Sequence, residues 1–179
     1  SSAVGEDSEQ ASAAGQYETI LNVTSREMLR GAIASIQASY DNSQAVQYRR
    51  QLGLPEDAMA VLIQKQVRGV FSGVAFSRDP IAQQGDAVII EALPGDAAQV
   101  VSGQITPEEY RVVVTLADNV ETQIASLQDT SLQIEGSGNV PPTIIKQVAL
   151  LARQLENRYH GIPQDIEWSY DGETLWLLQ

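Results

Sequence analysis

The stretch DIEWSYDGETLWLLQ, residues 165–179, predicts a β-hairpin with its turn at Asp171 and Gly172. Glycine tolerates the backbone angles that tight turns require, and aspartate readily bonds to the backbone of a turn. Successive side chains of a strand point to opposite faces, so Asp165 and Glu167 leave the first strand on the same side. The other, apolar side consists of Ile166, Trp168 and Tyr170. The hairpin therefore has one carboxylate face and one face suited to a core.

The length of the turn decides which residues of the two strands lie opposite each other. A two-residue turn would pair Asp165 with Leu178 and direct Gln179 away from the carboxylates. A three-residue loop instead pairs Trp168 with Trp176. It also brings Gln179 opposite Asp165. We expect this second register, because it matches the aromatic side chains and places no carboxylate against a leucine.

In the expected register, the carboxylate face of the hairpin gains an amide oxygen. Glu167 and Gln179 lie diagonally across this face, and Asp165 stands two residues from Glu167. Two carboxylates and an amide oxygen, completed by water, suit a Mg²⁺ ion that arrives on phosphate oxygens. Acidic residues on the outer face of a hairpin are also commonly just solvated. The geometry alone leaves both interpretations open.

Upstream of the hairpin, β-branched stretches separated by glycine, proline or aspartate predict further strands. The expected strands cover residues 59–67, 70–78, 86–93 and 110–115. Residues 117–140 are polar and rich in serine, glutamine and glycine, so we expect a long loop there.

Three segments show the spacing of amphipathic helices. Thr24 and Glu27 have the spacing of a capping box at the start of the first, whose apolar face consists of Leu29, Ile33, Ile36 and Tyr40. A second helix over residues 43–52 stops at Gly53. The third, residues 142–159, carries one apolar stripe of Ile145, Val148, Ala152, Leu155 and Tyr159. The fold class is therefore α+β, a mainly antiparallel sheet with packed helices.

The composition fits one globular domain and excludes several classes of protein. The 179 residues are 43% hydrophobic and carry a formal net charge of −12, with only 11 basic residues. Nucleic-acid binding draws its affinity from clustered Lys and Arg, so DNA and RNA are not expected partners. No apolar run is long enough to cross a bilayer, and the opening residues do not resemble a signal peptide. Without cysteine, disulfides and thiolate metal sites are excluded.

Several stretches, taken in order, resemble the ATP-binding domain of phosphoenolpyruvate synthases, pyruvate phosphate dikinases and rifampin phosphotransferases. They are SSAVGEDS…ASAAGQYETILNV (1–23), IQKQVRGVFSGVAFSRDP (63–80), VVSGQITPEEY (100–110) and PQDIEWSYDGETLWLLQ (163–179). The resemblance implies a single incomplete ATP-grasp domain over residues 1–179. Its parts would be a phosphate-loop region (1–23), a helical segment (24–58) and a sheet-rich lobe (59–179) with the helix 142–159 and the terminal hairpin 164–179.

The resemblance also implies a function, the ATP-binding part of a cytoplasmic enzyme like phosphoenolpyruvate synthase (pyruvate, water dikinase). Such an enzyme transfers a phosphoryl group from Mg-ATP to a catalytic histidine on a separate domain, for onward transfer to pyruvate. The implied cofactors are ATP and Mg²⁺. The implied partners are the phosphohistidine and phosphoenolpyruvate/pyruvate-binding domains of the parent chain, with no nucleic acid and no membrane. Two alternatives stay open, a rifampin phosphotransferase-like enzyme and a non-catalytic nucleotide-sensing or docking module.

Site residues follow from the resemblance by position. A loop over residues 12–19 would cover the ATP phosphates, because small residues let backbone N–H groups approach phosphate oxygens closely. Its nucleotide-contacting residues would be Ser12, Gly15, Gln16 and Thr19. The hinge strand, whose main chain would meet the adenine edge, consists of Gln64, Lys65, Gln66 and Val67. Glu167 and Gln179 would contact both nucleotide and Mg²⁺, with Asp165 as a supporting metal ligand.

The sequence departs from the family pattern at three places. Where the family has a Gly-Glu element, this chain has LPGDAAQ (93–99), which leaves Asp96 as the acidic candidate for a nucleotide contact. The family's Arg residues that flank the positions of Ser1 and Gln179 are absent, as is an earlier phosphate-binding Lys. We therefore expect a chain that is incomplete at both ends and inactive by itself, because phosphoryl transfer depends on charge neutralisation by such cations.

For the remaining cationic side chains we expect no direct role in catalysis. The side chains of Lys65, Arg68 and Arg78 are expected to be solvated. His160 lies at a helix end before Gly161, where a positive charge favours the helix dipole. We expect it to be structural rather than the phosphoryl-accepting histidine.

Overall fold

The computed structural model describes residues 2–3, 7–8, 11–12, 17–53, 59–81, 86–95, 106–116 and 130–179. The chain divides into two compact units, Ser1–Gln66 and Val67–Gln179. Together, the described residues form three helices and a six-stranded antiparallel sheet, so the expected α+β class is confirmed and is consistent with a partial ATP-grasp fold. Within these ranges, no helix has the length and apolarity needed to cross a membrane.

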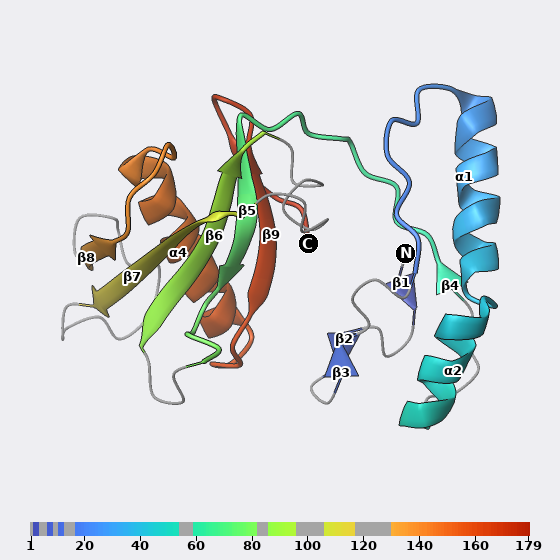
Figure 1. Ribbon diagram of the computed structural model, residues 1–179, viewed down its shortest axis with the longest axis horizontal. Coiled ribbons are helices and arrows are strands. Elements are labelled where there is room, and N and C mark those ends of the chain that lie inside the picture. Colours follow the sequence, from blue (N-terminus) through green and yellow to red (C-terminus); the bar gives the residue numbers. More distant parts are fainter. Residues whose placement is uncertain are drawn as a thin grey trace. The chain divides into compact units, whose positions relative to one another are not determined.

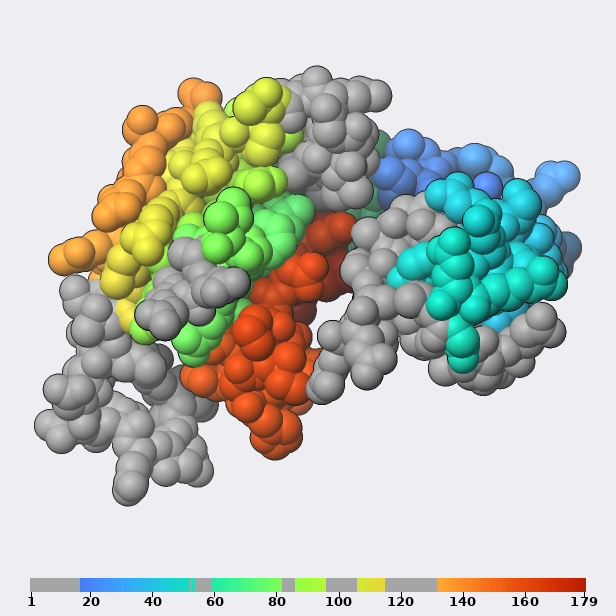
Figure 2. Space-filling model, turned by 60° about the horizontal axis from the view of Figure 1, so that its bottom comes forward, coloured from blue at the N-terminus to red at the C-terminus, as the bar shows by residue number. Residues whose placement is uncertain are grey.

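The second unit is built on the six-stranded sheet, with strand order β10-β9-β5-β6-β7-β8. The strands are β5 (Phe71–Phe76), β6 (Ala87–Pro94), β7 (Glu108–Leu116), β8 (Thr130–Glu135), β9 (Asp165–Tyr170) and β10 (Leu175–Leu177). Every neighbouring pair is antiparallel. Figure 2 shows the side chains of β7 (yellow) between those of β6 and β8 (orange), as this order requires.

Helix α4 (Pro142–Arg158) packs against one face of this sheet and forms the core with it (Figure 1). Alternate positions of the central strands supply the buried aliphatic side chains, and the expected stripe of the helix covers them. Trp168 of β9 is completely buried in this core. Gly73 on the neighbouring strand leaves room for the indole, because a Cβ atom there would lie 2.9 Å from a ring carbon of Trp168. Helix α4 and the strands together therefore bury the apolar face of the sheet.

The C-terminus of α4 ends in a hydrogen-bonded cap built on His160. The N–H of Gly161 donates to the Glu156 carbonyl at 2.8 Å, and the N–H of His160 donates to the Asn157 carbonyl at 3.2 Å. This is the pattern of a Schellman cap, whose central residue adopts a left-handed conformation that is usually filled by glycine. His160 has that conformation, with φ of 59°. The helix therefore ends one residue earlier than expected, and Tyr159 lies outside its buried stripe with 54% exposure.

We predict that His160→Gly stabilises the chain by about 0.5–1 kcal/mol, because glycine adopts the left-handed conformation without a Cβ penalty. Urea unfolding followed by tryptophan fluorescence measures the change. Gly161→Ala is the matched control from the same cap: its φ of 82° also disfavours a side chain, so this variant should lose stability. A loss of stability in His160→Gly would show that the histidine side chain contributes more than its backbone costs.

The first unit contains helices α1 (Arg26–Ser39) and α2 (Ser43–Leu52) and two small antiparallel sheets. The sheets pair β1 (Ser2–Ala3) with β4 (Met59–Ala60) and β2 (Asp7–Ser8) with β3 (Ala11–Ser12). The buried centre consists of Ile36 and Met59, with Tyr17, Ile20, Tyr40 and Val61 packed around them. The Arg49 guanidinium lies 3.6 Å from the ring centroid of Tyr40, whose other neighbour is the stacked ring of Tyr17.

The structure corrects several element boundaries. Ser25, not Thr24, caps α1, because its hydroxyl accepts the Met28 N–H at 3.1 Å. The expected strand over 59–67 is limited to Met59–Ala60, and residues 61–69 are in no strand. Part of the expected loop over 117–140 is strand β8, which pairs with β7. The bounds of α2 and its stop at Gly53 are confirmed.

Candidate functional site

The terminal hairpin has a longer loop than the sequence suggested, so the expected register is wrong by one residue. Trp168 pairs with Leu177, and Trp176 pairs with Ser169. The physical reason lies in the loop, where the Asp171 carboxylate accepts the indole N–H of Trp176 at 2.7 Å. The same carboxylate accepts the backbone N–H groups of Glu173 and Thr174 at 3.0 and 2.8 Å. These bonds also hold the pKa of Asp171 at about 2 and outweigh the matching of the two tryptophans.

A β-bulge at the end of the hairpin brings Gln179 to Glu167 in spite of the changed register. The N–H groups of Leu178 and Gln179 both donate to the Glu167 carbonyl, at 2.8 and 3.4 Å. The Glu167 N–H donates to the Gln179 carbonyl at 2.9 Å. Two residues of one strand thus lie opposite one residue of the other, which defines a bulge. The main chains of Gln179 and Glu167 are therefore hydrogen-bonded neighbours.

The expected alternation along β9 is confirmed. Ile166 is 4% and Trp168 0% exposed, whereas Asp165 is exposed and Glu167 half-buried. On β5, these two acidic residues lie opposite Phe76 and Val74. Burial raises the pKa of Glu167, and the charge of Asp165 raises it further. The surroundings of Glu167 therefore disfavour its ionised form.

The chemistry of this donor set fits a Mg²⁺ ion. Asp165 and Glu167 offer carboxylate oxygens, and Gln179 offers an amide oxygen, which are hard ligands of the kind that Mg²⁺ prefers. Across the described parts of the chain, no group of three or more His, Cys, Asp or Glu residues could hold a metal. A cation at this hairpin would consequently take its other ligands from phosphate oxygens and water.

We predict that Glu167→Gln raises the stability of the nucleotide-free chain at neutral pH. A carboxyl group whose folded pKa lies above its unfolded value costs the folded state free energy once the pH exceeds the unfolded pKa. The gain should therefore shrink in acid and vanish below about pH 4, where both states are protonated. Thermal unfolding over a pH series measures it, with Glu173→Gln in the exposed loop of the same hairpin as control. A gain that persists in acid would contradict this electrostatic cause.

The segment Gln64–Val67 coincides with the division between the two units, which falls after Gln66. Gln64, Lys65 and Gln66 are exposed. The side chain of Gln66 is used within the first unit: its oxygen accepts the Asn22 N–H at 2.7 Å, and its amide donates to the Asn22 side chain at 3.3 Å. A nucleotide contact by Gln66 would therefore have to come from its main chain, as the resemblance implies.

The phosphate-loop residues are only partly described. Ser12 lies in β3, and Thr19 is exposed in the first unit. Gly15, Gln16 and the departing residue Asp96 lie outside the described residues, so their expected contacts stay predictions.

Comparison with known proteins supplies the family. Residues 1–179 match the family described as "Pyruvate phosphate dikinase, AMP/ATP-binding domain". The chain belongs to this family.

The chain resembles individual members of the family over its whole length. It is 31% identical to the probable phosphoenolpyruvate synthase of Methanocaldococcus jannaschii, covering 100% of this chain and 16% of that protein. It is 32% identical to the rifampicin phosphotransferase of Bacillus cereus, covering 100% of this chain and 22% of that protein. It is also 31% identical to the prodigiosin synthesizing transferase PigC of Serratia marcescens, again covering 100% and 22%. The chain thus spans about a sixth to a quarter of the length of these phosphotransferases and synthases.

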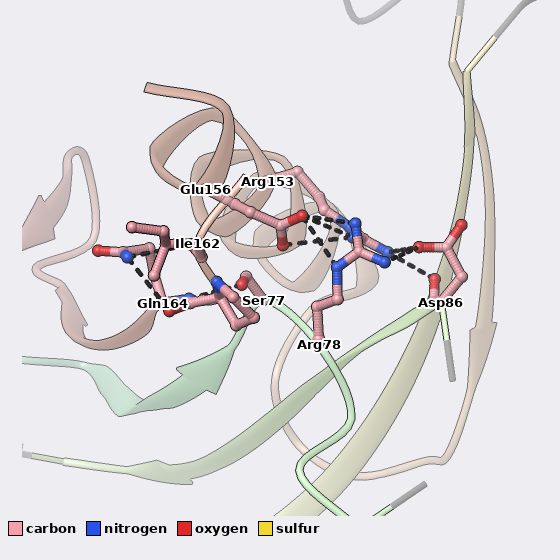
Figure 3. A network of polar contacts seen from close by, with 8 residues as sticks. Ser77, Arg78, Asp86, Arg153, Glu156, Ile162 and Gln164 are labelled. Atoms are coloured by element: carbon pink, nitrogen blue, oxygen red, sulfur yellow. Dashed lines mark hydrogen bonds and ion pairs between the residues drawn. The ribbon is translucent and has the colours of Figure 1, made fainter. Parts of the chain in front are cut away.

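A network of charged residues in this ATP-binding domain was missed by the sequence analysis (Figure 3). Glu156 of α4 is 3% exposed, and its carboxylate accepts from Arg78 at 2.7 and 2.9 Å. Arg153 lies 3.4 Å from the same carboxylate and donates to the side chain and the carbonyl of Asp86 at 2.6 Å. Arg78 is exposed, as expected from the sequence, but it lies after β5 and also forms an ion pair with Glu156. A signal was present, since Glu156 falls four residues after Ala152 on the apolar stripe of the helix.

The network connects α4 to the ends of two strands. Burial raises the pKa of Glu156, but hydrogen bonds from Arg78 and Ser77 and the charge of Arg153 outweigh burial and lower it below its ordinary value of 4.5. Ser77 also bonds across to the start of β9, donating its N–H to the Gln164 carbonyl at 2.7 Å. Its hydroxyl accepts the Gln164 N–H at 2.8 Å. The strand that carries the site carboxylates is thus anchored at its first residues.

We predict that Glu156→Ala destabilises the chain by about 3 kcal/mol, because two guanidinium groups lose a buried partner. Since the pKa of Glu156 is lowered in the folded state, its contribution is present above the ordinary value of 4.5 and is lost as the pH falls from there through the lower pKa of the folded state. The difference in the free energy of unfolding between Glu156→Ala and the unaltered chain should therefore become smaller in acid. Urea unfolding at pH 7 and pH 4 measures both effects.

Glu135→Ala is the control for this prediction. It breaks an exposed ion pair with Arg111 and should change stability by less than about 1 kcal/mol. Equal losses in the two variants would show that the buried network contributes no more than a surface pair.

Proposed function

We propose that this chain is the ATP-binding part of a phosphoenolpyruvate synthase-like phosphotransferase. The whole enzyme would transfer a phosphoryl group from Mg-ATP to a catalytic histidine on a separate domain, for onward transfer to pyruvate. The proposal is supported by the family match over residues 1–179 and by the 31% identity to the probable phosphoenolpyruvate synthase of Methanocaldococcus jannaschii.

The observation that carries the proposal is the carboxylate face of the terminal hairpin. Glu167 and Asp165 share one face of β9, and the bulge joins the main chain of Glu167 to that of Gln179. Burial and the charge of Asp165 raise the pKa of Glu167, so its surroundings disfavour the ionised form and would favour a neighbouring cation. A site that accumulates negative charge is suited to receive a metal–phosphate complex.

Each group has a distinct role in the proposed site. Glu167 and Gln179 would hold Mg²⁺ with their side-chain oxygens, and Asp165 would support them. Such a cation would supply charge neutralisation for the phosphate groups. Main-chain groups of Gln64–Val67 contact the adenine, and the loop Ser12–Thr19, with Gly15 and Gln16, contacts the phosphates. Glu167 lies on β9 between two buried residues, Ile166 and Trp168, which fix the strand that carries it.

The test uses the full-length polypeptide that carries this sequence, incubated with Mg-ATP and pyruvate. Phosphoenolpyruvate formation, followed by phosphorus NMR, is the expected result. Glu167→Gln should lower kcat by at least about a hundredfold, because it removes charge that positions the metal–phosphate complex. Glu173→Gln, from the exposed loop of the hairpin, should leave the rate unchanged. Full activity in Glu167→Gln would remove the hairpin from the mechanism.

A second candidate is an enzyme that phosphorylates an antibiotic, favoured by the 32% identity to the rifampicin phosphotransferase of Bacillus cereus. ATP binding would be the same, and only the final acceptor would differ. Offering pyruvate and rifampicin in parallel reactions separates the two: consumption of ATP that depends on rifampicin alone would replace the first proposal by the second. ATP binding without turnover of either acceptor would favour a non-catalytic nucleotide-sensing module.

A further inference from the structure

A buried pair of hydroxyl groups lies where the chain enters the sheet of the second unit. Ser72 of β5 and Ser169 of β9 are paired across the two strands, and their Oγ atoms are 2.9 Å apart. Their exposed fractions are 0% and 1%. A buried hydroxyl group costs the folded state free energy unless it is hydrogen-bonded. The bond between the two serines therefore holds both side chains in place. Ser169 is two residues from Glu167 and lies on the same face of β9.

Gly69 packs directly against the Ser72–Ser169 pair. A Cβ atom at position 69 would lie 2.5 Å from the Ser169 hydroxyl oxygen and 2.9 Å from the Gly95 carbonyl oxygen, and closer still to the Ser72 hydroxyl. All three contacts are inside van der Waals distance. An added side chain would have to move both serine hydroxyls, and its contact with the Gly95 carbonyl is one that only a main-chain shift relieves. Glycine is needed at position 69 for close approach, not for an unusual backbone angle, since its φ is not in the left-handed range.

The residue after Gly69 is held from two sides. The Val70 N–H donates to the Tyr170 carbonyl at 2.7 Å, and the Val70 carbonyl accepts the Gly95 N–H at 2.9 Å. From position 69 onward, the path of the main chain is therefore fixed by its neighbours. On the other side, Gln66 is bonded to Asn22 within the first unit. Only Val67 and Arg68 lie between these two anchors.

We propose that Gly69 and the Ser72–Ser169 pair are positioning residues for base selectivity. They hold the N–H and C=O groups of Val67 where these match adenine. This inference rests on the proposed function, which assigns the adenine contact to the main chain of Gln64–Val67. Adenine presents a donor at N6, whereas guanine presents an acceptor at the corresponding O6. A main chain displaced at Val67 would therefore lose the preference for adenine while the phosphate and metal contacts persist.

The experiment compares Mg-ATP and Mg-GTP binding to the full-length protein by calorimetry. The unaltered protein should prefer ATP, and Gly69→Ala should reduce that preference by about tenfold or more, because small displacements of positioning groups have large effects. GTP affinity should change by less than about threefold, since it does not use the adenine contact. Gly31→Ala is the matched control: it lies in α1 with no atom within 4 Å of the added methyl, and both affinities should stay unchanged.

A second variant removes the two serine hydroxyl groups without adding bulk at position 69. Ser72→Ala together with Ser169→Ala leaves Gly69 its space and should also lower the preference for ATP, by a smaller factor than Gly69→Ala. If both nucleotides weaken by the same factor in these variants, or if the preference is unchanged, the positioning role is wrong while the proposed function stands. If the unaltered protein binds neither nucleotide, the proposed function fails, and this inference fails with it.

Discussion

The pleat of strand β9 sets where the candidate site can be. It turns Trp168 into the core, with 0% exposure, and leaves Glu167 on the opposite face of the sheet. A shift of one residue against β5 would exchange these faces, exposing the indole and burying a carboxylate. Full burial of a large apolar side chain contributes about 2–3 kcal/mol, and an unpaired buried charge costs more than that. Gly73 has no side chain and so leaves room for the Trp168 indole in this register.

Two glutamates of the second unit show how different surroundings shift the pKa of a partly or fully buried carboxylate in opposite directions. Burial raises the pKa of both, but Glu156 lies against two arginines, which reverse the direction. The charge that acts on Glu167 is that of Asp165, which raises its pKa further. The protein thus supplies compensating charge where a carboxylate holds α4 to the strands. At the hairpin, we propose that a bound cation supplies this compensation.

Periodic features could be predicted from the sequence, and features that depend on individual side-chain contacts could not. The alternation along β9, the bounds of α2 and the stripe of α4 as far as Leu155 follow from side-chain spacing, and the structure has them. The hairpin register was missed because it is decided by one bond, from the Trp176 indole to Asp171. Glu156 pairs with Arg78 and Arg153, and Arg78 is far from Glu156 in the sequence. The resemblance supplied the roles of Gln64–Val67 and the phosphate loop, because main-chain contacts leave no side-chain pattern.

We propose that the hairpin offers Asp165, Glu167 and Gln179 together to a cation carried by a nucleotide. The decisive experiment is a crystal structure of the full-length protein with Mg²⁺ and a non-hydrolysable ATP analogue. We expect a Mg²⁺ ion at about 2.0–2.1 Å from side-chain oxygens of Glu167 and Gln179, with phosphate oxygens completing its shell. A nucleotide bound with its metal on other residues, and the hairpin carboxylates facing only water, would contradict it.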